Sequence, residues 1–166
     1  VLKASPVAEF TSAGAARVAQ AVEKVGVDGI MVMPALVYSS KPHETAAHFR
    51  SVATATDLPI MVYNNPPIYK NDVTPDILIS LADCDNVVCF KDSSGDTRRF
   101  IDVRNEVGDR YGIPVVNKRI TVSPIGTVCA GYSRDQMVKV CKLLDDCATD
   151  AGVDFLGGFG ALVEKG

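Results

Sequence analysis

The stretch Asn-Val-Val-Cys-Phe-Lys-Asp-Ser-Ser-Gly-Asp at residues 86–96 decides the fold. A run of apolar, β-forming residues leads into Lys91, a small polar turn with a glycine follows, and residues 97–107 have the pattern of a helix. An uninterrupted apolar strand is typical of a parallel sheet that is covered on both faces. Functional groups in such sheets lie at the carboxyl ends of the strands. The stretch therefore places Lys91 where chemistry is expected.

Lys91 offers a specific reaction at that position. Apolar surroundings remove solvation from an ammonium group and favour the neutral amine, which is a nucleophile. With a carbonyl substrate the amine forms a Schiff base, an electron sink for carbon–carbon cleavage, aldol addition or dehydration. A lysine at a strand end can also extend its charged group into water without any catalytic role. The sequence leaves both interpretations open.

Strand and helix patterns alternate along the chain. Strands are expected at 1–4, 29–33, 60–63, 86–90, 113–117 and 152–156. Helices are expected at 13–25, 41–56, 75–82, 97–107 and 135–149, with caps at Thr11 or Ser12, at Thr74 and at Ser133. The connections are short enough for right-handed βαβ units. The pattern predicts a single α/β domain over residues 1–166, built as a parallel sheet of alternating βα units.

The composition argues against several classes of protein. The net charge of −3 gives no reason to expect nucleic acid or an anionic membrane as a partner. No apolar run approaches the roughly 20 residues of a membrane span, and the amino terminus does not have the pattern of a signal peptide. The five cysteines form no Cys-x-x-Cys pair, which favours free thiols in a reducing, cytoplasmic setting. His43 and His48 do not share a helical face as a zinc pair would, so we expect no metal site.

Tyr63 is the second candidate residue. It ends the strand that precedes the strand of Lys91, and neighbouring parallel strands lie about 4.8 Å apart with their carboxyl ends on the same edge. A phenol there could transfer a proton to or from the substrate as the Schiff base forms and collapses. A tyrosine packed at a strand end with its hydroxyl in water is the alternative.

A larger set of motifs resembles a known family. The set comprises residues 26–34, 41–42, 47–49, 57–66 with the sequence Tyr-Asn-Asn-Pro at its end, and 86–96. Over about residues 26–110 it resembles the dihydrodipicolinate synthase and N-acetylneuraminate lyase family. Within that family it is most similar to 2-keto-3-deoxy sugar acid dehydratases, such as L-2-keto-3-deoxyarabonate dehydratase.

The resemblance implies a (β/α)8 barrel enzyme of the class I aldolase type, which acts on a 2-keto acid without a cofactor. Lys91 matches the Schiff-base lysine of the family and Tyr63 matches its catalytic tyrosine. Ser93 and Ser94 occupy the loop beside the lysine, where small polar residues can face the substrate. Tyr38 lies near a family tyrosine that can serve the site of a neighbouring subunit.

The chain also departs from the family. A (β/α)8 barrel needs about 250 residues, and the Gly-Thr-Thr-Gly-Glu type loop that binds the substrate carboxylate in the family has no match here. The first two strands of the family are absent, and residues 1–25 stand in the place of the third strand and its helix without a match. Residues 112–124 and 152–166 resemble a different family of uncharacterised bacterial proteins, so the section 111–166 is unlike the section 26–110. We therefore expect a partial or rearranged TIM-barrel-like fold, in a fragment, a recombined chain or an engineered chimera.

Two functions remain open on this basis. The first is a Schiff-base lyase or dehydratase that acts on a 2-keto acid such as a 2-keto-3-deoxy sugar acid, and that is inactive if the incomplete barrel cannot hold the substrate. The second is a non-catalytic α/β domain. An incomplete barrel leaves sheet edges open, so we expect a homo-oligomer. Residues 117–119, Asn-Lys-Arg, would form either an anion site or a solvated turn.

Overall fold

The computed structural model describes residues 2–36 and 38–160. The chain divides into two compact units, Val1–Ile113 and Pro114–Gly166, which are described separately below. The division falls close to the border at residue 111 that the two resemblances indicate. That the whole chain forms one domain stays a prediction.

The first unit is built from alternating strands and helices. Their order is β1 (Ala4–Val7), α1 (Ser12–Val25), β2 (Gly29–Val32), α2 (Pro42–Ala53), β3 (Ile60–Asn64), α3 (Pro66–Tyr69), α4 (Pro75–Ser80), β4 (Val87–Asp92), α5 (Arg99–Asp102) and the π-helical segment η1 (Val103–Arg110). The strands form one parallel sheet in the order β1-β2-β3-β4. The predicted α/β fold with a parallel sheet of βα units is confirmed.

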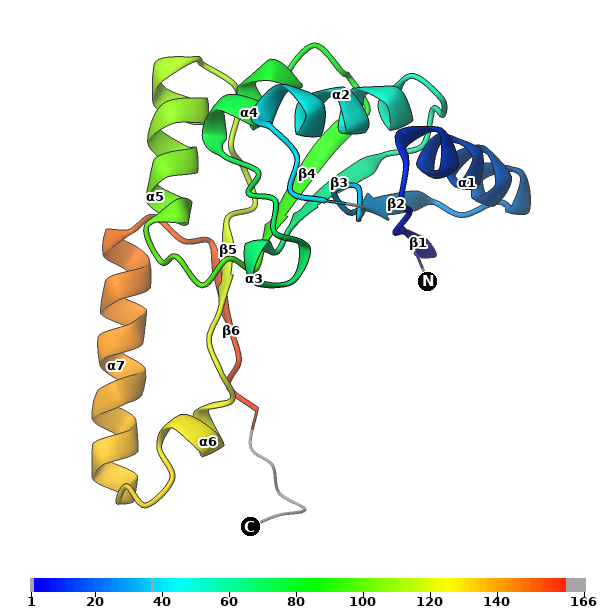
Figure 1. The fold of residues 1–166 in the computed structure, drawn as a ribbon. Coiled ribbons are helices and arrows are strands. Elements are labelled where there is room, and N and C mark those ends of the chain that lie inside the picture. The colour runs from blue at the N-terminus through cyan, green and yellow to red at the C-terminus, as the bar shows by residue number, and fades with distance from the viewer. Residues whose placement is uncertain (1, 37, 161–166) are drawn as a thin grey trace. The chain divides into compact units, whose positions relative to one another are not determined.

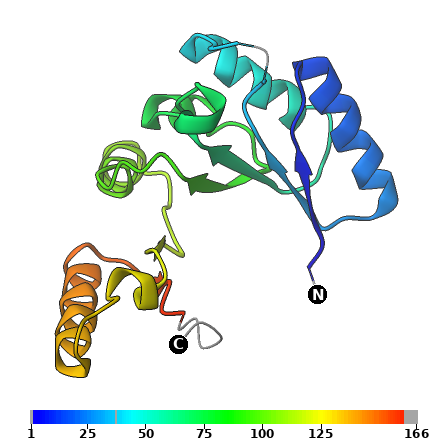
Figure 2. The same cartoon turned by 60° about the horizontal axis from the view of Figure 1, so that its bottom comes forward.

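Helices α1, α2 and α4 lie on one side of the sheet (Figures 1 and 2). Helix α1 begins where the Thr11 side chain accepts a hydrogen bond from the backbone N–H of Gly14, and it ends at Gly26, whose φ of 84° suits a glycine. Helix α2 has Pro42 in its first turn, where no backbone donor is lost. These local signals explain why both helices were predictable from the sequence.

The hydrophobic core lies between these helices and one face of the sheet. Phe49 and Leu81 are almost fully buried in it, and burial of such a side chain stabilises the fold by about 1.5–3 kcal/mol. Its members are Val7, Ala15, Ala19, Ile30, Val32, Phe49, Val52, Ala53, Ile60, Val62, Val73, Ile77 and Leu81. The sheet residues that alternate with them, such as Met31 and Met61, are only half-buried. The helices thus cover one face of the sheet and hold its strands in register.

His48 connects the two longest helices of the unit. Its ring Nδ1 lies 3.1 Å from the hydroxyl of Ser12 in α1, and its Nε2 lies 2.9 Å from the carbonyl oxygen of Met33 after β2. The side chain is buried, and burial lowers the pKa of the imidazole from its ordinary value of 6.5. His48 is therefore a structural residue, held neutral between α1, α2 and the end of β2.

Strand β4 differs from the prediction. The sequence indicated a strand covered on both faces, but Val88 is 63% exposed and Cys89 is also exposed. The reason is that β4 is the last strand of the four-stranded sheet and has one neighbour, β3, within its unit. An apolar run can belong to such a strand as well as to a central one.

Several boundaries also differ from those expected. The predicted helix 97–107 begins at Arg99 and changes to a π-helix at Val103, and the predicted helices 41–56 and 75–82 end earlier, at Ala53 and Ser80. A short helix, α3, occupies residues 66–69, where no helix was expected, because Pro66 and Pro67 fix φ near the helical value. The strand expected at 1–4 begins at Ala4, and Val1 lies outside the described residues.

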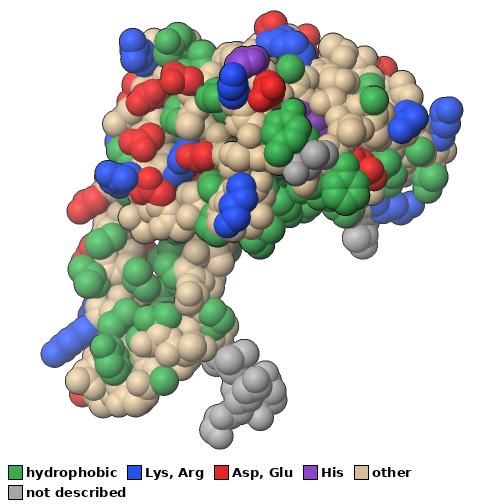
Figure 3. Space-filling model, viewed as in Figure 1, with side chains coloured by type: hydrophobic (Ala, Val, Ile, Leu, Met, Phe, Trp, Pro, Cys, Tyr) green, Lys and Arg blue, Asp and Glu red, His purple; other side chains and the backbone are tan. Residues whose placement is uncertain are grey.

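Over its described residues, 114–160, the second unit contains one parallel strand pair and a long helix. Its elements are β5 (Arg119–Thr121), α6 (Ile125–Val128), α7 (Arg134–Asp150) and β6 (Phe155–Gly157). Strands β5 and β6 pair in parallel, and Ser133 and Gln136 form the predicted capping box of α7. Apolar side chains are visible on the surface of this unit over α7 (Figure 3), and Tyr132, Val138 and Leu143 are among those exposed.

The strand predicted at residues 113–117 is wrong. Residues 113–116 have no regular structure, Asn117 has a positive φ of 53°, and β5 begins only at Arg119. Pro114 has no backbone donor for a sheet and Asn117 tolerates the left-handed region, which together explain the late start.

In the segment 117–119, Lys118 pairs with Asp154 at 3.2 Å, and the guanidinium of Arg119 lies 5.7 Å from the ring centroid of Phe155.

Among residues 2–36 and 38–160, no helix combines the length and the apolar character that crossing a bilayer requires. The same residues contain no group of three or more His, Cys, Asp or Glu side chains that could hold a metal ion.

Candidate active site

Lys91 and Tyr63 lie next to each other at the carboxyl ends of β4 and β3. The two strands pair in parallel with Tyr63 opposite Lys91, which confirms the predicted adjacency of their strands. The Nζ atom of Lys91 lies 4.8 Å from the centroid of the Tyr63 ring. A cation over the face of a phenol ring is attracted by the ring quadrupole, by about 0.5–1 kcal/mol at an exposed site. The pair is therefore in contact through the ring face of Tyr63.

The surroundings of Lys91 are not the apolar pocket that the sequence suggested. Its side chain is exposed, whereas Tyr63 is half-buried. The physical reason is that Lys91 lies on the last strand of the sheet of its unit, on the strand positions that alternate with the core residues. Within the first unit, contact with the Tyr63 ring is what orients the amine.

The hydroxyl of Tyr63 is surrounded by hydrogen-bond donors. The amide nitrogen of Asn65 donates to it at 2.9 Å, and the side chain of Ser93 interacts with it from the loop after β4. Ser93, then Asn65, and more weakly the charge of Lys91 lower the pKa of Tyr63 from its ordinary value of 10.0, because each favours the phenolate, while burial raises it. Tyr63 is thereby made a stronger acid than a free phenol.

Ser94 has a different role from Ser93, although both were predicted to face the substrate. Its hydroxyl donates to the carboxylate of Asp92 at 2.6 Å, and it also accepts from the backbone N–H of Asp96 at 3.1 Å. Ser94 therefore shapes the turn after β4. Of the two serines, the structure brings Ser93 to the tyrosine.

Tyr38 is not brought to the pair by any contact that the structure describes. It lies in the loop between β2 and α2 and is 62% exposed, and its backbone carbonyl accepts a weak hydrogen bond from Asn71 at 3.4 Å. A role for its side chain in the site of a neighbouring subunit stays a prediction.

A polar network below the pair, in which Asn64 and Arg99 are buried and Asp72 is exposed, was missed by the sequence analysis. Asn64 is fully buried, and its amide nitrogen donates to Asp92 at 2.7 Å and to Asp72 at 3.0 Å. Arg99 of α5 forms a salt bridge with Asp72 at 2.8 Å and donates to the carbonyl of Val73 at 3.0 Å. The network fixes the ends of β3 and β4 against each other, one residue beyond Tyr63 and Lys91.

A signal for part of this network was present in the sequence. Asn64 directly follows Tyr63, and Asp92 directly follows Lys91, so any register that pairs the first two residues also pairs the second two. Their side chains point to the face opposite to that of the candidate catalytic residues, because successive residues of a strand alternate.

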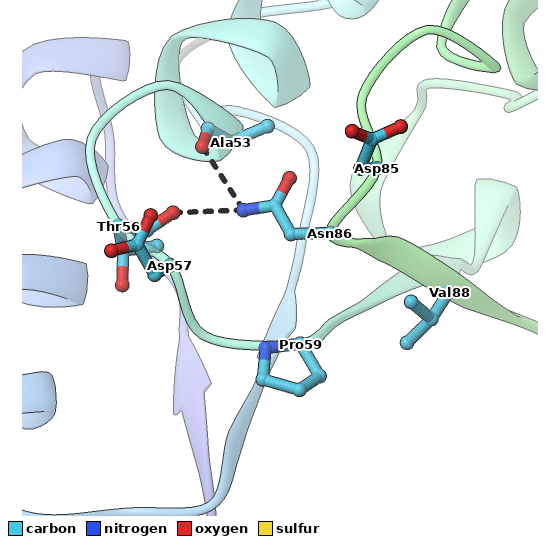
Figure 4. A pocket seen from close by; sticks show the side chains of 7 residues that line it. All are labelled: Ala53, Thr56, Asp57, Pro59, Asp85, Asn86 and Val88. Atoms are coloured by element: carbon cyan, nitrogen blue, oxygen red, sulfur yellow. Dashed lines mark hydrogen bonds between the residues drawn. The ribbon is translucent and has the colours of Figure 1, made fainter.

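A shallow cavity of about 460 Å³ lies elsewhere, at the amino-terminal ends of β3 and β4 (Figure 4). It is lined by Ala53, Thr56, Asp57, Pro59, Asp85, Asn86 and Val88. The amide of Asn86 donates to the carbonyls of Ala53 and Thr56 at 3.0 and 2.8 Å, as Figure 4 shows. The cavity is therefore separate from Lys91, which lies at the other end of β4.

Two family models match the chain. The model of the dihydrodipicolinate synthetase family matches residues 9–115, and the model described as Uncharacterised ACR (DUF711) matches residues 78–166. The first match begins before residue 26, so the expectation that residues 1–25 have no counterpart in the family is wrong from residue 9 onward. Residues common to both matches include β4 and Lys91.

Curated relatives share only a segment with this chain. A UPF0210 protein of Desulfovibrio desulfuricans is 66% identical over 68 residues, which make up 41% of this chain and 15% of the relative. A UPF0210 protein of Methanosarcina acetivorans is 39% identical over 95 residues, which make up 53% of this chain and 20% of the relative. The chain thus spans a small part of these relatives.

Solved structures show the same fold. Dihydrodipicolinate synthase from Bacillus anthracis has a TM-score of 0.67 and 18% identity, and the match covers 95% of this chain and 46% of that protein. YagE, a prophage protein of the dihydrodipicolinic acid synthase family from E. coli K12 in complex with pyruvate, has a TM-score of 0.62 and 23% identity. That match covers 67% of this chain and 38% of YagE. At these identities the similarity establishes the fold, a part of a TIM barrel, and the chain spans less than half of each structure.

The order of the strands and the Lys91–Tyr63 pair at their carboxyl ends agree with the match to the first model. The chain belongs to the dihydrodipicolinate synthetase family over residues 9–115 and to the DUF711 family over residues 78–166.

Proposed function

We propose that the first unit carries the reacting residues of a Schiff-base-forming lyase that acts on a 2-keto acid. The observation that carries the proposal is the pairing of Lys91 with Tyr63 on adjacent parallel strands, with Nζ 4.8 Å from the ring centroid. Membership of the dihydrodipicolinate synthetase family supports it. The chain spans less than half of the length of the solved relatives. That this chain has the activity of a complete enzyme is therefore also part of the proposal.

The proposed chemistry uses an amine and a phenol. The neutral amine of Lys91 attacks the ketone carbon of the substrate, and the resulting carbinolamine loses its hydroxyl group as water to give the imine. Tyr63 donates the proton that this hydroxyl needs in order to leave, and it takes a proton back when the imine is hydrolysed. The protonated imine withdraws electrons from the neighbouring carbon, so a proton can be lost there, and the β-hydroxyl group leaves with a proton as one molecule of water.

The substrate we propose is a 2-keto-3-deoxy sugar acid, with L-2-keto-3-deoxyarabonate as the specific candidate and dehydration as the reaction. The motif Tyr-Asn-Asn-Pro and the Lys-Asp-Ser-Ser-Gly stretch support this choice within the family. Ser93 is the proposed contact to the substrate beside Tyr63, and the solved structure of YagE contains pyruvate, the simplest 2-keto acid.

Reductive trapping tests the lysine. Incubation with pyruvate and borohydride should leave a stable adduct on Lys91, located by mass spectrometry of peptides. Lys91→Arg keeps a cation over the Tyr63 ring but cannot form the imine, so it should give no adduct, whereas Lys24→Ala on the exposed surface of α1 should give the wild-type yield.

Absence of an adduct on wild-type Lys91 would favour the second candidate, a non-catalytic α/β domain. The exposure of Lys91 is the observation that supports this candidate.

We also propose that the two family matches record a recombination of two genes, whether or not the protein is an enzyme. Sequencing of independent genomic clones across residues 78–115 can contradict this proposal.

We also propose that the protein is a homo-oligomer. Strands β1 and β4 are the two ends of the four-stranded sheet, and each pairs with one strand within its unit. Unpaired backbone groups on such strands favour pairing with another chain.

A further inference from the structure

Asn65 occupies an unusual position for an asparagine. It is the N-cap residue of the short helix α3, where an asparagine side chain normally accepts a hydrogen bond from the second or third backbone N–H of the helix. Here the first two helical residues are Pro66 and Pro67, which have no N–H, and the N–H of Ile68 bonds to the backbone carbonyl of Asn65 at 3.1 Å. The side-chain amide of Asn65 is therefore not used for capping.

The amide is directed at Tyr63 instead. Its nitrogen donates to the phenol oxygen at 2.9 Å, from a residue that is only 9% exposed. At the other end of α3, the ring of Tyr69 packs edge-on against the Tyr63 ring, with centroids 5.9 Å apart and an interplanar angle of 78°. Both ends of this one helical turn thus contact Tyr63, one at the hydroxyl and one at the ring.

We propose that Asn65 is a positioning residue for Tyr63, which fills one lone-pair direction of the phenol oxygen and so directs the phenol proton away from α3. This inference rests on the proposed function, in which Tyr63 transfers a proton beside Lys91. An amide N–H can only donate, so Asn65 cannot take the proton of the tyrosine itself.

Donation to an oxygen also favours its ionised form. Asn65 is the second-largest cause of the lowered pKa of Tyr63, after Ser93. Asn65 therefore affects two properties of Tyr63 that matter for proton transfer, the orientation of its O–H bond and its acidity.

The test is an NMR titration of the protein labelled with 13C at the Cζ of tyrosine. The Tyr63 signal is the one that is absent from Tyr63→Phe. In Asn65→Asp the donor becomes a charged acceptor of nearly the same shape, so the pKa of Tyr63 should rise by about one unit or more. Asn65→Ala removes the donor without adding a charge and should raise it by less.

Asn105→Asp is the matched control. Asn105 is exposed on η1, so the same change of charge there should leave the titration of Tyr63 as in the wild type. If Asn65→Asp is poorly folded by circular dichroism, Asn65→Ala decides the question. A Tyr63 titration in the Asn65 variants that equals that of Asn105→Asp would overturn the inference.

This titration needs no substrate, so it separates the inference from the proposed function. Failure of reductive trapping at wild-type Lys91 would remove the lyase proposal and with it the catalytic purpose of Asn65, even where the titration shifts. A normal adduct together with an unshifted titration would overturn the role of Asn65 alone. The expected result is an adduct at Lys91, a raised pKa of Tyr63 in both Asn65 variants, and slower trapping in Asn65→Ala at an unchanged pyruvate dependence.

Discussion

At the scale of single residues, the site depends on which small side chains reach the hydroxyl of Tyr63. Ser93 and Asn65 interact with it, while Ser94, adjacent to Ser93 in the sequence, turns to Asp92. Neighbouring residues of the same type therefore have different roles, because the chain turns directly after β4 and Ser94 belongs to that turn.

The two serines provide a direct comparison. Ser93→Ala removes the largest cause of the lowered pKa of Tyr63, so the phenol should titrate at a higher pH than in the wild type, and the shift should exceed that of Asn65→Ala. Ser94→Ala should leave the phenol titration unchanged, because its hydroxyl bonds to Asp92. The 13C NMR titration of Tyr63 measures both, and equal shifts in the two serine variants would contradict this assignment.

At the scale of elements, the sheet positions the site through buried polar contacts as well as through its apolar core. Asn64, Asp72, Asp92 and Arg99 connect β3, β4 and α5 by hydrogen bonds at 2.7–3.0 Å. Asn64 is fully buried, and burial of its side-chain amide is favourable only when the amide is paired, so its geometry is strongly constrained. Because they sit one residue beyond Tyr63 and Lys91, they hold those two strand ends in place.

His48 gives the junction of α1 and α2 a dependence on pH. Burial lowers the pKa of its imidazole below the ordinary value of 6.5. As the pH falls, His48 is therefore protonated in the unfolded chain before it is protonated in the folded protein. Its contribution to stability is therefore fully present above about pH 6.5 and is lost as the pH falls toward the folded-state pKa.

A comparison of variants isolates this effect. The difference in the free energy of unfolding between the wild type and His48→Gln should decrease from pH 7 to pH 5, as measured by urea unfolding. His43→Gln makes the same change at an exposed position of the same helix and is the control for the loss of an imidazole. A His48→Gln difference that grows at pH 5 would contradict the assignment.

At the scale of the whole molecule, the open ends of the parallel sheet have a consequence for assembly. Strand β4 carries Val88, which is 63% exposed, next to its unpaired edge within the first unit. Lysine on an edge strand discourages pairing with another chain, because association would bury its charge.

We therefore expect Val88→Lys to lower the average molar mass of the protein in light scattering at high concentration. The control is Val25→Lys, which adds the same charge at a residue of α1 that is 81% exposed, and it should leave the mass unchanged. A wild-type protein that is monomeric at all concentrations would contradict the proposed homo-oligomer.

Local patterns in the sequence were sufficient for many features of the fold. Thr11 and Gly26 delimit α1, and Ser133 with Gln136 begins α7, because capping depends on residues within one turn. The parallel order of the strands followed from the alternation of helices and strands, and the adjacency of Tyr63 and Lys91 followed from that order. These features need no information about distant parts of the chain.

Other features depend on contacts between distant segments. The exposure of β4 follows from its place at the end of the sheet, and the pairing of β5 with β6 joins two segments that are distant in the sequence. That the Asn65 side chain does not cap α3 follows from Pro66 and Pro67, which are visible in the sequence. Its hydrogen bond to Tyr63 depends on the path of the chain after β3, which the sequence did not show.

The sequence by itself determined that this is an α/β protein with a lysine and a tyrosine at the carboxyl ends of adjacent parallel strands. Only the tertiary structure decided that the lysine lies exposed over the ring of that tyrosine, and that Ser93 and Asn65 interact with the phenol hydroxyl. The physical reason is that periodicity and capping act over a few residues, whereas exposure and side-chain hydrogen bonds depend on which segments fold against each other.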